Sequence, residues 1–171
     1  YCEDLIFDFR LRDLYGPFPF ASDAVVHFRP RGNLRAFYKQ YYQYSRGDGK
    51  ADLWRRRHII RYLTYLAAGP LLVALALLHS PLWWLALLAG VAAYTATPYR
   101  RLWPMLASSG FLDRLKALLL VPVIRVVGDV AKMLGYPVGL LWRWRNLHRP
   151  EVHWRDYRIS SFGDQPTERY S

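Results

Sequence analysis

The sequence contains a single cysteine, Cys2, in 171 residues. One cysteine excludes a disulfide bond within the chain, which fits a reducing compartment. Acidic residues are also few: 13 Asp and Glu stand against 24 Lys and Arg, for a formal net charge of +11. This excess of positive charge indicates an anionic partner, such as nucleic acid, phospholipid headgroups or a phosphorylated substrate. The first residues also lack the basic segment and short apolar core of a targeting peptide.

Charge is absent from two apolar segments, residues 62–79 and 82–99, which Ser80-Pro81 separates. A helix of either length is about 27 Å long, close to the ~30 Å hydrocarbon core of a bilayer. The segments therefore predict a transmembrane helical hairpin, and the alternative is a pair of buried core helices. Arginines precede the first segment and follow the second, so the positive-inside rule places both chain ends in the cytoplasm. Because the cations cluster at these boundaries, the pattern argues against a nucleic-acid partner.

The first third of the chain is polar and predicts three elements. Residues 3–15 read as a helix, residues 24–28 as a short strand, and residues 34–45 as a second helix capped by Asn33. The run Gly47-Asp48-Gly49 is expected to break that second helix. One short strand cannot form a sheet alone, so this stretch predicts the C-terminal edge of a larger α/β domain.

Residues 111–142 are apolar but carry a narrow charged stripe, in which Asp129 can pair with Arg125 or Lys132. A stripe of this kind is typical of an amphipathic helix that lies in the membrane interface. A third membrane span is the alternative, at the cost of burying several charges. Pro122 is expected to kink the helix, and Gly135-Tyr-Pro137 is expected to end it.

Two groups of residues near the start can carry chemistry. Glu3 and Asp4 lie in the first turn of the first predicted helix, where acids ordinarily compensate the helix dipole. A carboxylate held near an acceptor hydroxyl can instead act as a general base. His27 follows valine in the predicted strand, and it is either a packed residue or a metal ligand. The spacing leaves both pairs of alternatives open.

A basic and aromatic helix from Arg35 to Arg46 forms the third group. Rings and cations on one helix can bind a nucleotide, a diphosphate or single-stranded nucleic acid. The alternative is a helix that packs its tyrosines on another domain. The basic run from Arg55 to Arg61 is interpreted as a headgroup anchor.

In order and spacing, the stretches Glu3 to Arg12, Ala24 to Phe28 and Leu34 to Gly49 resemble the final third of a family 2 glycosyltransferase. The apolar region after them resembles the C-terminal membrane anchor of many bacterial members. The resemblance implies a GT-A domain that inverts the anomeric centre. It also implies a nucleotide-sugar donor and a lipid-linked or membrane-associated acceptor, used in cell-envelope polysaccharide synthesis. The nucleotide-binding strands and an Asp-x-Asp metal motif are expected upstream, in a missing N-terminal part of the same enzyme.

The resemblance further implies roles for individual residues. Asp4 would be the catalytic base, with Glu3 beside it contacting the acceptor or the base. His27 would be a ligand of a divalent metal, Mg or Mn, whose other ligands lie mostly upstream. The substrate-binding or diphosphate-binding residues would be Gln40, Tyr41, Gln43 and Arg46. The Gln-x-x-Arg-Trp form of processive members is absent, which weakens any claim of processive polymer synthesis.

The sequence predicts that the chain has five parts, and it leaves one rival interpretation of the function. The parts are the C-terminal edge of an α/β GT-A catalytic domain (1–50), a basic linker (51–61), two transmembrane helices (62–101), an interfacial amphipathic helix region (102–145) and a polar, flexible tail (146–171). The expected location is the plasma (inner) membrane, multi-pass, with the active site in the cytoplasm and membrane lipids as partners. This fragment is expected to be inactive alone. The rival interpretation is a non-catalytic basic module that anchors to the membrane or recruits a partner.

Overall fold

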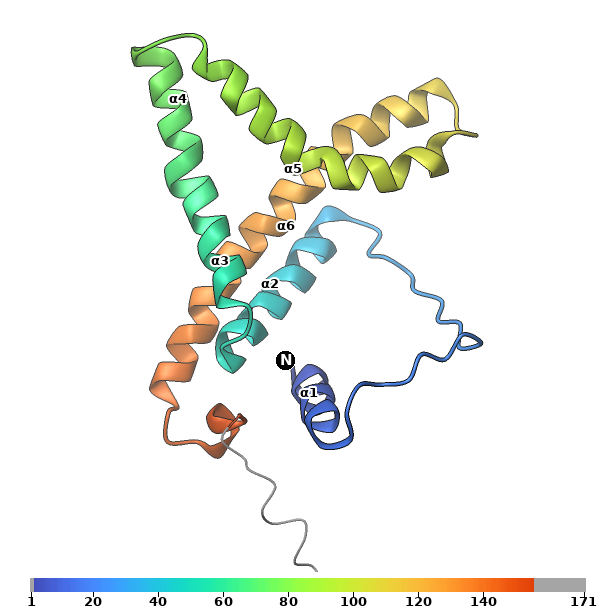
Figure 1. Ribbon diagram of the computed structural model, residues 1–171, viewed down its shortest axis with the longest axis vertical. Coiled ribbons are helices and arrows are strands. Elements are labelled where there is room, and N and C mark those ends of the chain that lie inside the picture. Colours follow the sequence, from blue (N-terminus) through green and yellow to red (C-terminus); the bar gives the residue numbers. More distant parts are fainter. Residues whose placement is uncertain (1, 156–171) are drawn as a thin grey trace, which may run out of the picture.

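The computed structural model describes residues 2–155, and in that range the chain consists of helices and the loops between them (Figure 1). The α-rich part of the predicted fold is therefore confirmed. The elements are, in order, α1 (Glu3–Tyr15), α2 (Leu34–Ala51), α3 (Arg55–Tyr62), the π-helical η1 (Leu63–Ala68), α4 (Gly69–Leu78), α5 (Trp83–Leu106), α6 (Phe111–Arg145) and the short 3-10 helix η2 (Pro150–His153).

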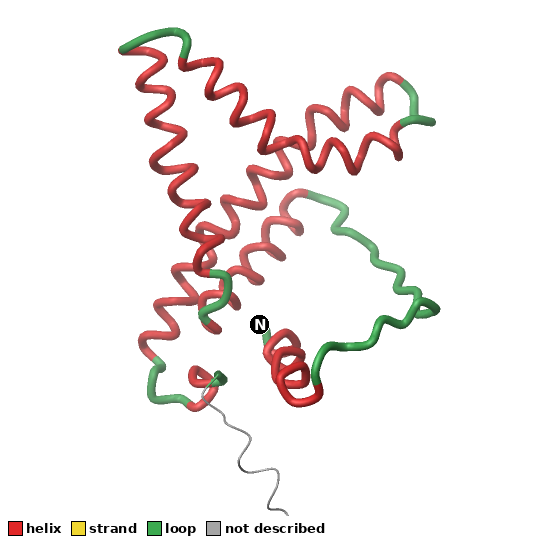
Figure 2. Tube along the Cα trace, viewed as in Figure 1, coloured by secondary structure: helices red, strands yellow, loops and turns green. Residues whose placement is uncertain are grey.

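The predicted strand at residues 24–28 is wrong. Figure 2 shows only loop between α1 and α2, and no strand occurs within residues 2–155. Val25, Val26 and Phe28 are 73%, 88% and 76% exposed in this extended segment. A strand requires a partner strand, and the described residues provide none. The α/β edge is accordingly not present in the described part of the chain.

Helix α1 has the predicted bounds and ends at Gly16, whose φ of +84° suits glycine. It packs on the rest of the molecule through Leu5, Ile6 and Phe9. The Phe9 ring stacks on Trp154 with centroids 5.9 Å apart. These apolar contacts hold the start of α1 next to the end of α2.

Helix α2 begins as predicted, because the Asn33 side chain accepts a hydrogen bond from the Ala36 amide at 2.8 Å. The predicted break at Gly47-Asp48-Gly49 is wrong, since the helix continues to Ala51. Gly49 instead lies against the backbone of α6, where a Cβ would meet the Gly139 Cα at 2.9 Å. Burial against a second helix compensates for the poor helix propensity of glycine.

Close contact between α2 and α6 forms the centre of the molecule (Figure 1). Helix α6 contributes the small residues Gly128, Ala131, Gly135 and Gly139 to this junction, and all four are buried. A Cβ on Gly135 or Gly139 would overlap a backbone carbonyl of α2. Small residues at spacings of three and four allow two helix backbones to approach this closely.

One helix within residues 2–155 is long and apolar enough to cross a bilayer. It is the continuous rod of α3, η1 and α4, Arg55–Leu78, whose most apolar window has a mean hydropathy of 1.6 and is almost entirely exposed. This rod contains residues 62–78 of the first predicted span, 62–79, and His79 caps its end.

The second predicted span, residues 82–99, lies in α5 from residue 83 onward, and this helix does not meet the same measure. Trp83 and Trp84 begin this helix, and tyrosine, threonine, proline and arginine dominate residues 94–101, which leaves a shorter apolar stretch. The structure therefore does not show the predicted hairpin of two spanning helices. Helices α4 and α5 contact each other but diverge from the turn at residues 79–82 (Figure 1).

Helix α6 runs unbroken from Phe111 to Arg145, so the end predicted at residues 135–137 is wrong. A proline inside a helix leaves the carbonyl four residues earlier without its amide donor. The Tyr62 hydroxyl donates to the Met133 carbonyl at 2.6 Å, four residues before Pro137. Tyr99 donates in the same way to the Leu118 carbonyl, at 2.7 Å, four residues before Pro122. Hydroxyls from neighbouring helices thus replace both missing donors.

The expected flexible tail falls mostly on residues 156–171, which lie outside the described residues. The segment 150–155, by contrast, buries two side chains, Val152 and Trp154. Trp154 is buried and donates from Nε1 to the Ala51 carbonyl at 3.0 Å. Arg143 of α6 donates to the carbonyls of Lys50 and Val152, so this segment closes over the end of α2.

Candidate functional site

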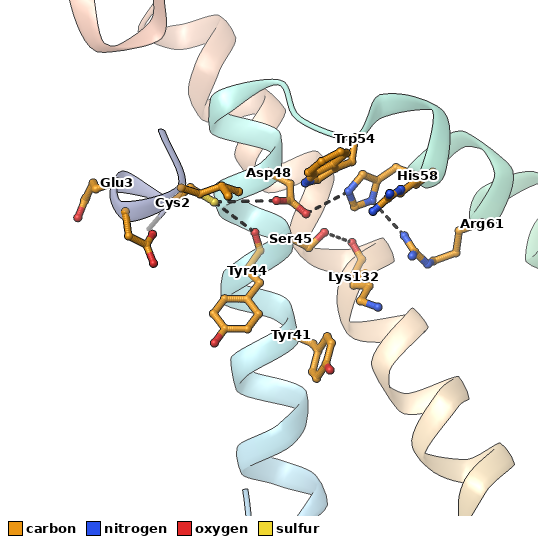
Figure 3. A pocket seen from close by; sticks show the side chains of 13 residues that line it. Cys2, Glu3, Tyr41, Tyr44, Ser45, Asp48, Trp54, His58, Arg61 and Lys132 are labelled. Carbon is orange, nitrogen blue, oxygen red and sulfur yellow. Dashed lines mark hydrogen bonds and ion pairs between the residues drawn. The ribbon is translucent and has the colours of Figure 1, made fainter. Parts of the chain in front are cut away.

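A pocket of about 900 Å3 opens where the start of α1 meets α2, α3 and α6. Figure 3 shows its lining side chains. Three acids and three cations lie around it with His58, and two tyrosines and a tryptophan supply the apolar wall. The acids are Glu3, Asp4 and Asp48, and the cations are Arg57, Arg61 and Lys132.

The two predicted carboxylates, Glu3 and Asp4, lie on the rim of this pocket in the first turn of α1. Both are exposed. Figure 3 shows Glu3 at the outer edge, pointing away from Asp48 and His58. Accessible carboxylates at a pocket mouth can receive a proton from a hydroxyl bound there.

One face of α2 forms the pocket wall. Tyr41, Ser45 and Asp48 follow each other at spacings of four and three, which places them on one side of the helix. Ser45 is fully buried and donates to the Lys132 carbonyl of α6 at 2.7 Å. The Lys132 ammonium lies 4.7 Å from the Tyr41 ring centroid. This face of α2 is therefore fixed against α6.

A chain of polar contacts crosses the floor of the pocket (Figure 3). The Cys2 Sγ lies 3.9 Å from Asp48 Oδ1, and the other Asp48 oxygen lies 3.4 Å from His58 Nε2. His58 Nδ1 is 3.2 Å from an Arg61 nitrogen. The His58 ring is 2% exposed and stacks on Tyr136 at 3.8 Å, so it is held in one orientation.

The chain of contacts continues to Asp129 of α6, which joins three helices. Arg61 Nε donates to Asp129 Oδ1 at 2.8 Å, and Tyr94 of α5 donates to Oδ2 at 2.6 Å. The predicted pair of Asp129 with Lys132 is confirmed at 4.0 Å, although Arg61 is closer. A half-buried carboxylate with these partners has most of its hydrogen-bonding capacity satisfied.

Two groups in the pocket have shifted pKa values. Burial, followed by the nearby Asp48 carboxylate, raises the pKa of the Cys2 thiol to about 11. Cys2 is consequently a poor nucleophile at neutral pH. Burial, followed by the positive charge of Arg61, lowers the pKa of Lys132.

The other predicted site residues do not line the pocket. Gln40 donates to the Tyr44 hydroxyl at 2.7 Å and accepts from Arg31. Gln43 is half-buried on α2, and Arg46 has a buried Nε with no hydrogen bond among the described residues. Of the residues predicted to bind substrate or diphosphate, Tyr41 alone lines the pocket, together with Glu3 and Asp4.

His27 lies exposed in the loop between α1 and α2. No group of three or more His, Cys, Asp or Glu that could hold a metal ion occurs among residues 2–155. The described residues therefore do not themselves fit a metal site, and the metal predicted from the resemblance stays a prediction.

The sequence-based interpretation missed Asp48, His58, Arg61 and Lys132 as pocket residues. Asp48 was assigned to a helix break, and His58 and Arg61 to a headgroup anchor. The spacing of Tyr41, Ser45 and Asp48 was a usable signal, because it places a carboxylate on a helix face with a serine and a ring. No local pattern relates that face to His58, since a separate helix carries it.

Comparison with known proteins adds no relative: no protein-family model, no curated protein and no solved structure matches this chain.

Proposed function

We propose that this chain is the C-terminal part of an inverting glycosyltransferase. The enzyme would transfer a sugar from a nucleotide-sugar donor to a membrane-associated acceptor in cell-envelope glycan synthesis. One observation carries the proposal: the exposed Asp4 carboxylate lies on the rim of a 900 Å3 pocket that also holds Arg57, Arg61 and Lys132. A base and a group of cations around one cavity suit a reaction that removes a proton and releases an anion.

In the proposed reaction the carboxylate and the three cations have separate roles. Asp4 accepts the proton of the acceptor hydroxyl as the hydroxyl oxygen attacks the anomeric carbon. The bond from that carbon to the nucleoside diphosphate breaks, and the diphosphate leaves with the electron pair. Arg57, Arg61 and Lys132 stabilise the negative charge that develops on it. Attack from the side opposite the leaving group inverts the anomeric centre.

Two further parts come from the resemblance. The nucleotide-binding half and the divalent metal would be supplied by a region of the enzyme upstream of this sequence. Tyr41, which lines the pocket, would stack on a ring or sugar bound there.

The membrane would hold the site near its acceptor. In this proposal the rod Arg55–Leu78 crosses the plasma (inner) membrane and α5 returns, with the pocket and both chain ends in the cytoplasm. Support comes from Arg55, Arg56 and Arg57, which are exposed at the first turn of the rod, directly beside the pocket. A lipid-linked acceptor would reach the pocket without leaving the bilayer.

A second candidate is a basic, non-catalytic membrane anchor that recruits a partner. The exposed apolar surface of α4 and α5 favours it, because Leu71, Leu77, Leu85 and Leu88 are each more than half exposed. It assigns no role to the pocket at the cytoplasmic end of the rod.

Substituting Asp4→Asn in the full-length enzyme tests the two. The transferase proposal expects turnover to fall by about 1,000-fold while the donor binds as before, because the amide cannot accept the proton. Asp8→Asn is the matched control, since Asp8 is exposed one turn further along α1 and does not line the pocket. Equal turnover in both variants would remove Asp4 as the base. The 171 residues alone should not transfer sugar from any nucleotide sugar.

A further inference from the structure

A second cavity, separate from the pocket, lies between the diverging helices α4, α5 and α6. It is an open groove of about 910 Å3, and its walls are almost entirely apolar, with Leu72, Val73, Leu87, Val91 and Val126 among them. Apolar walls of this size exposed to water are unfavourable. Inside a bilayer the same groove would be filled by a hydrocarbon chain.

The length of the groove suits a lipid chain. It extends along the rod from Thr64 to Leu78. At about 1.5 Å per residue this is roughly 21 Å, more than the ~15 Å depth of one bilayer leaflet. A chain that enters at the Thr64 end can therefore lie along α4 through the depth of its leaflet.

Irregular helix geometry shapes one wall. Residues 63–68 are π-helical, and Gly69 and Pro70 follow directly. A Cβ on Gly69 would meet the Thr64 carbonyl oxygen at 3.1 Å. Single π-helical turns within α-helices occur frequently at functional sites, because they widen the helix and redirect its side chains.

The Thr64 end of the groove is polar and positively charged. Tyr65 and Tyr94 line it, their hydroxyls lie 2.9 Å apart, and both donate to Asp129. The Arg125 guanidinium lies 4.3 Å from the Tyr94 ring centroid. The cations Arg61, Arg125 and Lys132 outnumber the carboxylates Asp129 and Asp48 in this region, which leaves a net positive charge for an anionic headgroup.

We propose that this groove binds the hydrocarbon chain of an anionic, phosphate-bearing membrane lipid, with the phosphate near Arg125 at the Thr64 end. The apolar length selects a lipid rather than free phosphate, and the excess of cations selects an anionic headgroup rather than a neutral one. The lipid binds from the cytoplasmic leaflet, the side on which the arginines of α3 lie.

The groove also meets the candidate active site. Arg61 lines the pocket and bonds to Asp129, and Asp129 accepts from Tyr94, which lines the groove. A phosphate held at this junction lies at the edge of the pocket. The bound lipid is then the acceptor or its carrier; this assignment, unlike the binding itself, rests on the proposed glycosyltransferase function.

Photo-crosslinking of the full chain in phosphatidylcholine vesicles tests the binding. Three probes carry the same diazirine-labelled acyl chain with different headgroups: phosphatidic acid, phosphatidylcholine and diacylglycerol. Mass spectrometry locates the adducts. We expect the phosphatidic acid probe to label groove residues such as Val73 and Val91 about fivefold more than either other probe. Equal labelling by the three probes would identify bulk lipid and overturn the proposal.

Two matched pairs of variants locate the site. Leu87→Trp fills the groove and should lower this labelling by about tenfold, whereas Leu88→Trp, on the exposed side of α5, should not. Arg125→Gln should abolish the preference for the phosphate, whereas Arg101→Gln, at the exposed end of α5, should keep it. Circular dichroism verifies that each variant folds. Labelling that ignores Leu87→Trp, or a groove occupied by a second copy of the chain in crosslinked dimers, would contradict the proposal.

The lipid-binding result and the enzyme result can fail separately. Asp4→Asn should leave the crosslinking unchanged, because Asp4 lies on the pocket rim and not in the groove. Crosslinking with unaltered turnover in Asp4→Asn would retain the lipid site and reject the base. Loss of turnover in Asp4→Asn without selective crosslinking would do the reverse.

Discussion

Two junctions of α6 with its neighbours differ in what fills them. Against α2 the two backbones almost touch, because glycines at positions 49, 135 and 139 leave no side chain between them. Against α4 and α5 large aliphatic side chains face an open groove of about 910 Å3. The same helix is thus in backbone contact with α2, whereas along the groove only side chains line the space between it and its neighbours.

The junction of α2 with α6 is rigid, whereas the groove between α4, α5 and α6 is adaptable. Backbones in direct contact cannot shift without breaking many contacts together, so α2 and α6 hold Asp48 and Lys132 at fixed positions in the pocket. The groove has no such contacts across it, and its width can follow whatever occupies it. A fixed site beside an adaptable apolar cavity would suit the proposed enzyme, whose acceptor would come from the membrane.

Substituting Gly139→Ala should disrupt the close junction of α2 with α6 and have the largest effect on stability. The added Cβ would overlap the Arg46 carbonyl and lie 2.9 Å from the Gly49 Cα. Backbone atoms cannot rotate aside, so we expect the free energy of unfolding to fall by about 3 kcal/mol. Unfolding by SDS in mixed micelles, followed by circular dichroism, measures it.

The matched control is Gly90→Ala in α5. No atom lies within 4 Å of a Cβ at that position. Alanine favours a helix over glycine, so this variant should be more stable by about 0.5–1 kcal/mol. If both alanines change the stability in the same direction, the α2–α6 junction is not closely packed.

Local patterns in the sequence were enough to predict the bounds of α1, the start of α2 and the apolar part of the rod. The apolar spacing of residues 3–15 gave α1, Asn33 gave the start of α2, and the uncharged run after Arg61 gave the apolar rod. Each depends on neighbours within one or two helical turns. Glu3 and Asp4 were singled out for the same reason, as adjacent acids on a first turn.

Long-range contacts explain the predictions that were wrong. Glycines predicted to break α2 are buried against α6, and Pro137, predicted to end α6, leaves a carbonyl that accepts from Tyr62 of another helix. The predicted strand at residues 24–28 has no partner in the described residues. Asp48 and His58 meet because two helices fold together, which no single-segment pattern encodes.

Asp129 lies where the α2–α6 junction meets the groove, and substituting Asp129→Asn should weaken the contacts between the helices there. The amide keeps the shape of the side chain but loses the charge that holds Arg61 at 2.8 Å, with both side chains about one-sixth exposed. We expect the free energy of unfolding to fall by about 2 kcal/mol, because Arg61 would remain partly buried without its carboxylate. The same SDS titration measures it.

Asp113→Asn is the control for that change, because Asp113 lies on the same helix but is 67% exposed and 4.0 Å from Lys116. A surface pair of this kind contributes less than about 0.5 kcal/mol. Equal losses in the two variants would show that Asp129 does not link the helices.

Substituting Tyr62→Phe should have the smallest effect on stability, because it removes a single hydrogen bond to α6. It removes the hydroxyl that donates to the Met133 carbonyl, which Pro137 leaves without an amide donor. We expect a loss of about 1 kcal/mol in the free energy of unfolding. Pro137→Ala restores an amide four residues after Met133, so adding it to Tyr62→Phe should recover most of that loss. If the loss is the same with alanine at position 137, the Tyr62 hydroxyl stabilises the fold independently of the proline and does not compensate for the missing amide.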